Sequence, residues 1–459
     1  MGEAAASTAG DAGSVSSATT GATGTAADPE VERYRTVAHR LHEIAKPVRV
    51  LSALRWPASV REDFLAGGAQ TLPAVEYPPF DEQPIVDAVR EIRRSIYPGV
   101  VVDDWLESVA TSLENTARML AARGTESFLT YNRALYGTPH TPLRYDPITP
   151  HELAERVHDV LTGLERIGLS SEVAHDHSAQ EVADLLSAGV TAHFGPDDAP
   201  TVMVVDELSA NALATASRIK VRSGARFTAR DAAQLLNHEA FIHVLTAVNG
   251  RYQTDLPILA IGHPGTTRTQ EGLAVFAEFV SGTLELDRFR RLADRVVGVQ
   301  MAIDGADFVE LYRWFAERSP GPEQAFESTR RIFRGGPVTG GAPFTKDCVY
   351  LAGFLAVSTF IRAAFVQERL DCVGTLFAGK LDLFDIPALV ELRRLGLCRS
   401  PVHRPPWVLD PGWALTWLTY STFVAAIDLQ AVAGAVGHLL DRTPRLDPEP
   451  QQGEPRQHS

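Results

Sequence analysis

The stretch NHEAFIH (237–243) carries two histidines five positions apart, with a glutamate directly after the first. Zinc hydrolases commonly space their two histidines four positions apart, because that interval brings both side chains to one face of an α-helix. At five positions in a regular helix, His238 and His243 would point roughly 140° apart. They can converge only where the helix widens by one residue, as in a π-bulge. The stretch therefore predicts either a metal site in a locally widened helix or a helix with two unrelated histidines.

Two β-rich segments and a capping pattern lie directly before this stretch. TVMVVDEL (201–208) is rich in β-branched residues. SRIKVRSGARFT (217–228) alternates apolar and basic side chains, which is typical of an edge strand. Thr228 and Asp231 match a capping box, so a helix should begin directly after Thr228. The histidines are thus expected inside a rigid helix that follows a small sheet.

A zinc site needs a third protein ligand, and the segment GHPGTTRTQEGLAVFAEFVSG (262–282) offers one. Thr269 could cap a helix that places Glu271 in its first turn, and Gly272 would permit a close backbone approach. Glu278 lies two turns further on the same face, where it either orients a ligand histidine or is an ordinary solvated carboxylate. The helix should bury an apolar stripe made of Leu273, Phe276, Ala277 and Val280.

Two other histidine groups are weaker metal candidates. His151 and His158, with Glu152 between them, are expected as solvated polar residues at the start of a helix that Pro150 opens. His175-Asp176-His177 (175–177) lies in a polar loop, and side chains two positions apart share no helix face. We expect neither group to bind a metal ion.

Composition and charge limit the function classes. The chain has 459 residues, of which 45% are hydrophobic, so it can bury a large core. Its net charge is −14 without a basic stripe, so we expect binding to neither nucleic acid nor an anionic membrane surface. Three cysteines without a C-x-x-C pair and an N-terminus without a secretory signal fit a cytoplasmic protein that has no disulfides.

The chain divides by composition into four parts. The ends, 1–29 and 443–459, lack hydrophobic periodicity and are expected to be disordered tails. Residues 30–140 predict an N-terminal helical region, with one long helical run from Asp103 to Tyr136, and residues 141–442 hold the candidate site. Two apolar runs, 351–366 and 413–427, are shorter than a membrane span, and we expect both to be buried core helices. The fold class predicted is α+β, mostly helical, with a small sheet beside the site helix.

Several segments together resemble one family. HEAFIHVLTAVNGRYQ (238–253), GHPGTTRTQEGLAVFAE (262–278) and RRIFRGGPVTGGAPFTKDCVYLAGF (330–354) are similar to the bacterial flavohaemoglobin expression-modulating QEGLA-motif proteins, and YNRALYGTPH (131–140) is so more loosely. These proteins share a domain with the eukaryotic microtubule-associated tyrosine carboxypeptidases, zinc enzymes that remove the C-terminal tyrosine of α-tubulin. The resemblance covers roughly residues 30–440, and its specificity lies in the joint occurrence of three motifs: H-E-x-x-x-H, TRTQEGLA and FTKD.

The resemblance implies a role for each matching residue. His238 and His243 correspond to the zinc-binding histidines, Glu271 to the third ligand of the single Zn²⁺, and Glu239 to the general base. Zinc would lower the pKa of its bound water and polarise the scissile carbonyl, while Glu239 accepts the proton of that water. The tubulin-binding extensions of the eukaryotic enzymes have no evident counterpart in this chain, so the implication extends to the chemistry and not to tubulin.

Further candidates follow from what such a reaction requires. Tyr350 and Lys346 are four positions apart at the start of a helix and are the candidate donors to the tetrahedral oxyanion. A carboxypeptidase must also bind a terminal carboxylate, which suits the planar fork of a guanidinium group. Arg268 and Arg334 are the chosen candidates for that role. Two further arginines, Arg330 and Arg331, lie nearby.

The sequence thus predicts a zinc metallopeptidase of the gluzincin kind, with a two-lobed body and a site between the lobes. Its substrate is expected to be the C-terminus of a peptide or protein that ends in an aromatic or other large residue. Two alternatives stay open: a non-catalytic regulator that keeps the zincin fold and acts by binding a partner, and a zinc hydrolase of small amides. An intact Glu239 argues against the regulator, since a pure binder needs no general base.

Overall fold

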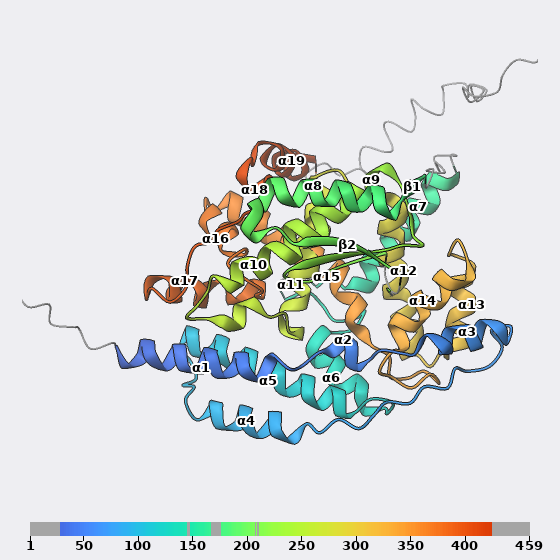
Figure 1. The fold of residues 1–459 in the computed structure, drawn as a ribbon, viewed down its shortest axis with the longest axis horizontal. Helices are drawn as coiled ribbons and strands as arrows, with labels where there is room; N and C mark the ends of the chain where they lie inside the picture. Colours follow the sequence, from blue (N-terminus) through green and yellow to red (C-terminus); the bar gives the residue numbers. More distant parts are fainter. Residues whose placement is uncertain (1–27, 145–146, 167–175, 207, 209–210, 425–459) are drawn as a thin grey trace, which may run out of the picture.

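The computed structural model describes residues 28–144, 147–166, 176–206, 208 and 211–424 (Figure 1). The predicted tail 443–459 and nearly all of the predicted tail 1–29 lie outside these residues, as does His175. Within the described part the chain is mostly helical with a small amount of strand, which confirms the predicted fold class.

Six helices make up the first part of the described chain. They are α1 (Pro29–Ala45), α2 (Val50–Ala53), α3 (Ala58–Ala66), α4 (Gln83–Arg93), α5 (Val101–Ala121) and α6 (Ser127–Tyr136). The single run predicted from Asp103 to Tyr136 is therefore two helices. The chain breaks it at Gly124, whose φ of 76° lies in the left-handed region and whose N–H bonds to Gly335 O at 2.9 Å.

Two longer helices and two small sheets follow. Helix α7 (Pro150–Arg166) begins at the proline expected to open it, and α8 (Ala179–Asp198) begins with a capping box. In the larger sheet β2 (Thr201–Val205) pairs in parallel with β4 (Arg218–Arg222), and β3 (Ala212–Ala214) pairs antiparallel with the other side of β4. In the smaller sheet β1 (His177–Ser178) pairs with β5 (Arg226–Phe227).

The expected edge strand is in fact the central strand of its sheet. Residues 217–228 form β4 and β5 as separate strands, and β4 lies between β2 and β3. Ile219 and Val221 are fully buried, as the alternation predicted, but hydrogen bonds run along both sides of β4. The edge positions belong to β2 and to β3, a three-residue strand too short for a periodicity signal.

The remaining elements are nearly all helical. They are α9 (Ala229–Leu235), η1 (Leu236–Val244), α10 (Leu245–Arg251), η2 (Pro257–Ala260), α11 (Pro264–Val280), α12 (Leu286–Ile303), α13 (Phe308–Ala316), α14 (Pro322–Phe333), η3 (Thr345–Cys348), α15 (Val349–Val366), α16 (Leu370–Thr375), η4 (Leu383–Asp385), α17 (Ile386–Arg394), α18 (Pro406–Leu409) and α19 (Gly412–Val424). In Figure 1 the larger sheet lies beside α8. Strand β3 contacts η1. The segments α9, η1 and α10 follow one another without a break.

Helix α11 is the most deeply buried long helix of the site region. The predicted stripe of Leu273, Phe276, Ala277 and Val280 is at most 1% exposed. Its opposite side is buried too, because Val275 belongs to a second hydrophobic cluster that includes residues of α5, α6, α7, α12 and α15. A helix that is buried on opposite sides is a core helix, so α11 gives the site a rigid floor.

Helices α11 and α15 cross with their backbones in contact. A Cβ atom added to Gly272 would lie 2.3 Å from Gly353 C, and one added to Gly353 would lie 2.1 Å from Arg268 O. The close approach expected at Gly272 is therefore present, but the partner is α15 and not the histidine helix. A third cluster, rich in aromatic side chains, packs α3, α13 and α14 together around Trp56 and Phe308.

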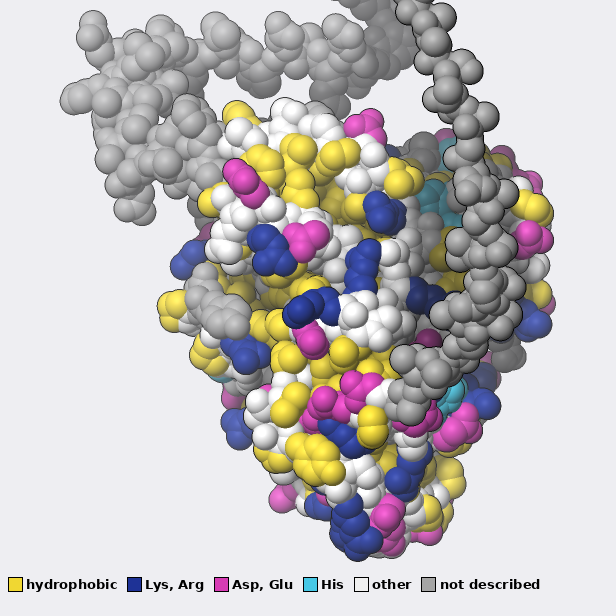
Figure 2. All heavy atoms as spheres, turned by 90° about the vertical axis from the view of Figure 1, so that its left-hand side faces the viewer, with side chains coloured by type: hydrophobic (Ala, Val, Ile, Leu, Met, Phe, Trp, Pro, Cys, Tyr) yellow, Lys and Arg dark blue, Asp and Glu magenta, His cyan; other side chains and the backbone are white. Residues whose placement is uncertain are grey.

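One helical stretch of the described chain, Thr345–Val366, is long and apolar enough to cross a membrane, judged by length and composition alone. It includes α15, which packs against α11 in the core, so it also has the features of a core helix. Cys348, Cys372 and Cys398 are free, as the absence of a cysteine pattern predicted. On the face seen in Figure 2, acidic and basic side chains are mixed, with hydrophobic side chains between them. That face therefore has no continuous basic stripe.

Candidate metal centre

The helix that carries the histidines begins where the capping pattern predicted. Thr228 N donates to Asp231 Oδ2 at 2.7 Å, and Asp231 N donates to Thr228 Oγ1 at 3.2 Å. This reciprocal pair satisfies two amide groups that the first helical turn leaves without partners. The start of α9 is thereby fixed about two turns before His238.

The helix then widens around the motif. Residues 236–244 form the π-helix η1, so both histidines lie within the wide segment. This confirms the local distortion that five-residue spacing requires. His238 and Ile242 are buried in this segment, whereas His243 is partly accessible.

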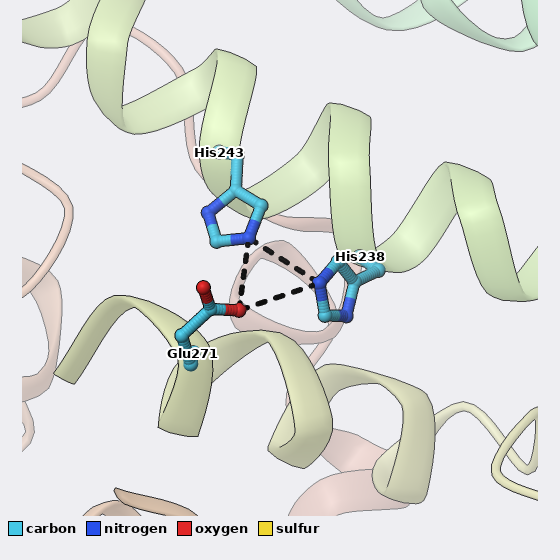
Figure 3. Close-up of side chains that lie close together, drawn as sticks. All are labelled: His238, His243 and Glu271. Carbon is cyan, nitrogen blue, oxygen red and sulfur yellow. Dashed lines mark hydrogen bonds and ion pairs between the residues drawn. The ribbon is translucent and has the colours of Figure 1, made fainter. Parts of the chain in front are cut away.

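The widening brings the two imidazole rings together with a carboxylate from the next helix (Figure 3). His238 Nε2 and His243 Nε2 are 3.3 Å apart, and Glu271 Oε2 lies 3.7 and 3.6 Å from them. Ligands about 2 Å from a tetrahedral zinc ion are roughly 3.4 Å from one another. These three distances are close to that value, so the donor atoms fit a single ion of that size.

Glu278 holds the first histidine in the orientation that a metal ligand needs. Its Oε1 lies 2.6 Å from His238 Nδ1 and accepts a hydrogen bond from that N–H, which leaves the lone pair of Nε2 free. Of the two roles left open for Glu278, the contact with a candidate ligand is the one observed, and its side chain is fully buried. Burial raises the pKa of Glu278, but Arg288 and His238 outweigh it and bring the pKa to about 2.

Two further side chains fix Glu278 in turn. Arg288 donates to both carboxylate oxygens, with Nη2 2.6 Å from Oε1 and Nε on Oε2. Gln234 Nε2 also donates to Oε1 at 2.9 Å. A buried carboxylate with three donors stays ionised, so it can stabilise the imidazole next to it.

The two carboxylate oxygens of Glu271, the third candidate ligand, make different contacts. Oε2 faces the histidines, while Oε1 accepts a hydrogen bond from Lys346 Nζ at 2.8 Å. Burial raises the pKa of Glu271, but Lys346 and the histidines hold it well below its usual value. Lys346, predicted as an oxyanion donor, therefore contacts a candidate ligand directly in this structure.

Helix α11 begins earlier than the sequence indicated. The predicted cap, Thr269, lies inside the helix and is 2% exposed, because α11 starts at Pro264 with His263 before it. Gly265 N, an otherwise unpaired amide of the first turn, donates to Ser112 Oγ of α5 at 2.9 Å. Glu271 is consequently about two turns into the helix and not in its first turn.

Glu239 lies next to a candidate ligand and faces the sheet edge. Its Oε2 accepts the backbone N–H of Ala214 at 3.1 Å. Because β3 pairs with β4 through its other side, this contact comes from the free edge of the sheet. The carboxylate of Glu239 is thus held between the histidine helix and an edge strand.

Tyr350 lies among basic side chains on the other side of Glu271. The ring of Tyr350 is 5.1 Å from Lys346 Nζ, so the two predicted partners do share a face. Arg295 Cζ is 5.8 Å from the same ring. Asp347 lies beside them and accepts two hydrogen bonds from Arg331, at 2.7 and 2.9 Å.

The other predicted arginines differ in their surroundings. Arg334 is 7% exposed, its Cζ lies 5.3 Å from the Phe344 ring, and its Nε has no hydrogen-bond partner among the described residues. Burial and the neighbouring Arg331 lower the pKa of Arg334 to about 10. Arg268 on α11 also has a buried Nε without a described partner. Arg330 instead pairs with Glu327 on its own helix.

Sequence reasoning missed two sets of basic residues near the centre. Arg288 and Arg295 lie seven positions apart on α12, with Arg291 between them, so a stripe of arginines at helical spacing could have indicated that face. Lys380, in the loop between α16 and η4, donates to His243 O at 3.1 Å. No local pattern identifies that lysine.

The described members of the other two histidine groups, which leave out His175, form no cluster of metal-ligand type. His158 Nε2 lies 2.9 Å from Asp294 Oδ1 on α12, so it is a tertiary contact and not a solvated residue. His151 packs against the ring of His140, and His177 lies 3.6 Å from Asp176. In the described parts of the chain, one group of at least three His, Cys, Asp or Glu residues has ligand atoms that all lie within 4.8 Å of one another. That group is His238, His243 and Glu271.

Comparison with known proteins adds a family match. A family model described as microtubule-associated tyrosine carboxypeptidase matches residues 62–426, which is well over half of the chain. The matched range contains every residue of the candidate metal centre. No curated protein matches the chain.

Proposed function

Because the chain belongs to the microtubule-associated tyrosine carboxypeptidase family, we propose that it is a zinc-dependent metallopeptidase. Specifically, we propose a carboxypeptidase that hydrolyses the last peptide bond of a peptide or protein. One observation carries the proposal: donor atoms of His238, His243 and Glu271 converge within 4.8 Å, directly beside Glu239. The gluzincin-like arrangement, the QEGLA-motif branch of the family and a cytoplasmic location are parts of the same proposal.

The donor set supports zinc as the metal. Two imidazole nitrogens and one carboxylate oxygen form the three-ligand set of catalytic zinc sites, in which a fourth position is left for water or substrate. His238 Nδ1–H donates a hydrogen bond to the carboxylate of Glu278, so Nε2 is the nitrogen whose lone pair is free for the metal. Glu271 is kept ionised by Lys346, and an ionised carboxylate is the form that binds a cation.

The chain's own residues supply the proton transfers. When bound, zinc lowers the pKa of a coordinated water and polarises the scissile carbonyl. Glu239 accepts the proton of the attacking water at its carboxylate and later delivers it to the leaving amine nitrogen. The contact of Glu239 Oε2 with Ala214 N–H keeps this carboxylate beside the motif before substrate arrives.

Tyr350 is the residue we assign to the oxyanion. Lys346, the other candidate, is already engaged with Glu271 at 2.8 Å, so its ammonium group is better suited to orienting that carboxylate. Tyr350 is 8% exposed and lies among cationic groups, which favours a hydroxyl that donates to a developing negative charge.

Two surfaces beside the centre suit a peptide C-terminus. The edge of β3 that reaches Glu239 offers backbone groups for an extended chain, as in strand addition to a sheet edge. On the other side, Arg295, Arg331 and Arg334 surround the single carboxylate of Asp347, which leaves more cationic than anionic charge. Since buried guanidinium groups without partners are costly, a substrate carboxylate would compensate them. Arg334 is therefore retained as a carboxylate-binding residue, and Arg268 as a second candidate.

The test compares wild type with Glu239→Gln, which removes the general base and leaves the ligands intact. We expect zinc near one ion per chain in both proteins, measured by elemental mass spectrometry after reconstitution. Trimming of a C-terminal peptide library should fall about 10³-fold in the variant. Glu317→Gln is the matched control, because that side chain is 76% exposed, and it should behave as wild type.

Two results would contradict the proposal. Absence of stoichiometric zinc in the reconstituted wild type would remove the metallopeptidase. Equal behaviour of wild type and Glu239→Gln, with zinc bound in both, would favour a non-catalytic regulator that keeps the site for binding.

A further inference from the structure

Lys380 extends from the loop between α16 and η4 to the underside of the wide turn. Its Nζ donates to His243 O at 3.1 Å and to Gln270 Oε1 at 3.3 Å. Both acceptors are neutral oxygens, and no described carboxylate forms an ion pair with this ammonium group. One acceptor belongs to His243, a candidate ligand, and the other to Gln270, which directly precedes the candidate ligand Glu271. Lys380 thus connects the two helices of the metal centre.

The loop that carries Lys380 is fixed to the helices around the centre. Three hydrogen bonds hold its backbone: Asn249 Nδ2 to Phe377 O at 2.7 Å, Gln253 Nε2 to Ala378 O at 3.1 Å, and Lys380 N to Leu259 O at 2.7 Å. Gly379 packs so closely that an added Cβ would lie 2.6 Å from Leu259 Cβ. The position of the ammonium group is therefore set by the fold and not by a flexible side chain alone.

Side-chain donors gather at the wide turn. Thr246 Oγ1 lies 2.7 Å from Ile242 O, while Lys380 bonds the next carbonyl, that of His243. Thr246 Oγ1 is also 2.8 Å from Gln270 Oε1, so one small polar network joins the turn to α11. A π-helix is a rare local departure from the α-helix, and Thr246 and Lys380 place side-chain donors at two consecutive carbonyl oxygens of this one.

The ammonium group is partly buried and bonds only neutral oxygens among the described residues. A partly buried cation without an ion-pair partner costs stability. A hydrophobic side chain of similar length would fill the same space without that cost, so the contact with the turn is the physical reason for a lysine.

We propose that Lys380 is a positioning residue, which holds the wide turn in the shape that brings His243 Nε2 to the metal. The inference rests on the proposed metal site and extends it to a residue outside the two motif helices. Lys380 acts through the backbone of a ligand and takes no part in the proton transfers.

The experiment measures zinc affinity by competition with a chromogenic chelator. Lys380→Met removes the donor and keeps the length, and we expect its zinc affinity to fall by about 10- to 100-fold. Lys380→Arg restores a cationic donor and should recover most of that loss. Lys46→Met is the matched control, since the Lys46 side chain is 61% exposed on α1, and it should bind zinc as wild type does.

Two additional readouts separate positioning from general stability. The visible absorption of Co²⁺-substituted protein reports ligand geometry, and it should change in Lys380→Met but not in Lys46→Met. Hydrogen exchange of the amides in 244–249 should accelerate in the same variant without a general increase elsewhere. Should Lys380→Met not fold, Lys380→Gln carries the test, because its shorter neutral side chain cannot reach the carbonyl.

The outcomes distinguish this inference from the proposed function. Wild-type zinc affinity and an unchanged Co²⁺ spectrum in Lys380→Met would overturn the positioning role while leaving the peptidase intact. Tight zinc binding in wild type without peptidase activity would overturn the proposed function, and the affinity comparison would still decide the role of Lys380.

Discussion

The two helices that form the metal centre supply their residues in different ways. Helix α11 is regular, and its two functional carboxylates, Glu271 and Glu278, are seven positions apart, which is about two turns. Helix η1 carries its two histidines five positions apart, and they converge only because the turn is wide. One helix therefore meets the geometry of the site with its ordinary repeat, and the other with a local departure from it.

The difference extends to what holds each helix in place. Helix α11 is fixed by packing, with buried apolar side chains on two opposite sides and a backbone contact with α15 at Gly272. Helix η1 has polar side chains at its carbonyl oxygens, from Thr246 and Lys380. We infer that side-chain packing positions the carboxylates of α11, whereas hydrogen bonds position the histidines of η1. Three predictions test that contrast.

The largest effect is expected where α11 meets α15. In Gly272→Ala the new methyl group would lie 2.3 Å from Gly353 C, so the two helices must separate. Overpacking of this kind costs about 3 kcal/mol of unfolding free energy, and Glu271 should move with its helix. Urea denaturation measures the loss, and chelator competition should show weaker zinc binding.

The matched control is Gly374→Ala in the short helix α16. A Cβ atom there meets nothing within 4 Å, so the alanine should be neutral or stabilise the protein by up to about 1 kcal/mol. If Gly272→Ala were as stable as wild type, packing would not be what positions α11.

A smaller effect concerns the start of α11, where the partly buried His263 accepts a hydrogen bond in its neutral form. Ser112 Oγ accepts the N–H of Gly265, so its hydroxyl proton is directed to His263 Nδ1, 3.1 Å away. Burial lowers the pKa of His263 from its usual value of 6.5 to about 4. The folded state therefore resists protonation, while the unfolded chain takes up a proton below about pH 6.5.

The direction of the pH effect on stability follows from the difference between the folded and unfolded pKa values of His263. The contribution of His263 to stability is fully present above about pH 6.5 and is lost as the pH falls towards 4. Between pH 7.5 and pH 5 the loss should be about 2 kcal/mol. Urea denaturation at both pH values should show a smaller difference in His263→Asn, because asparagine does not titrate in this range and is favoured at a helix N-cap position. An equal pH dependence in the two proteins would exclude this titration.

Local sequence patterns predicted the helix geometry at the centre, whereas the resemblance to a family implied the roles of its residues. The spacing of His238 and His243 required a wide turn, and the Thr228–Asp231 pair fixed the start of the helix; both follow from the geometry of a few consecutive residues. The predicted sheet before the helix is likewise present. Residues whose importance depends on distant contacts escaped prediction, as Lys380 and Arg288 show.

The wrong predictions have the same origin. Thr269 has the chemistry of a cap, but Ser112 from a helix 150 residues away in the chain allows α11 to start earlier, at Pro264. The β4 strand has the alternation of an edge strand, yet a three-residue partner, β3, covers its second side. In both cases the local sequence fits either structure equally well, and a contact with another segment of the chain determines which one forms.

The smallest effect is expected from the change that would appear most disruptive, deletion of Ala240 within the motif. A π-turn is an α-turn with one extra residue, so removing that residue allows a regular helix in which the histidines are four apart and still share a face. Zinc affinity should then change by less than about tenfold. Deletion of Ala247 in regular helix α10 is the control: it rotates the following residues by about 100°, which displaces Asn249 from Phe377 O and destabilises the protein. Complete loss of zinc from the Ala240 deletion, with Ala247 tolerated, would mean that the wide turn itself, and not the convergence it produces, is what the metal centre requires.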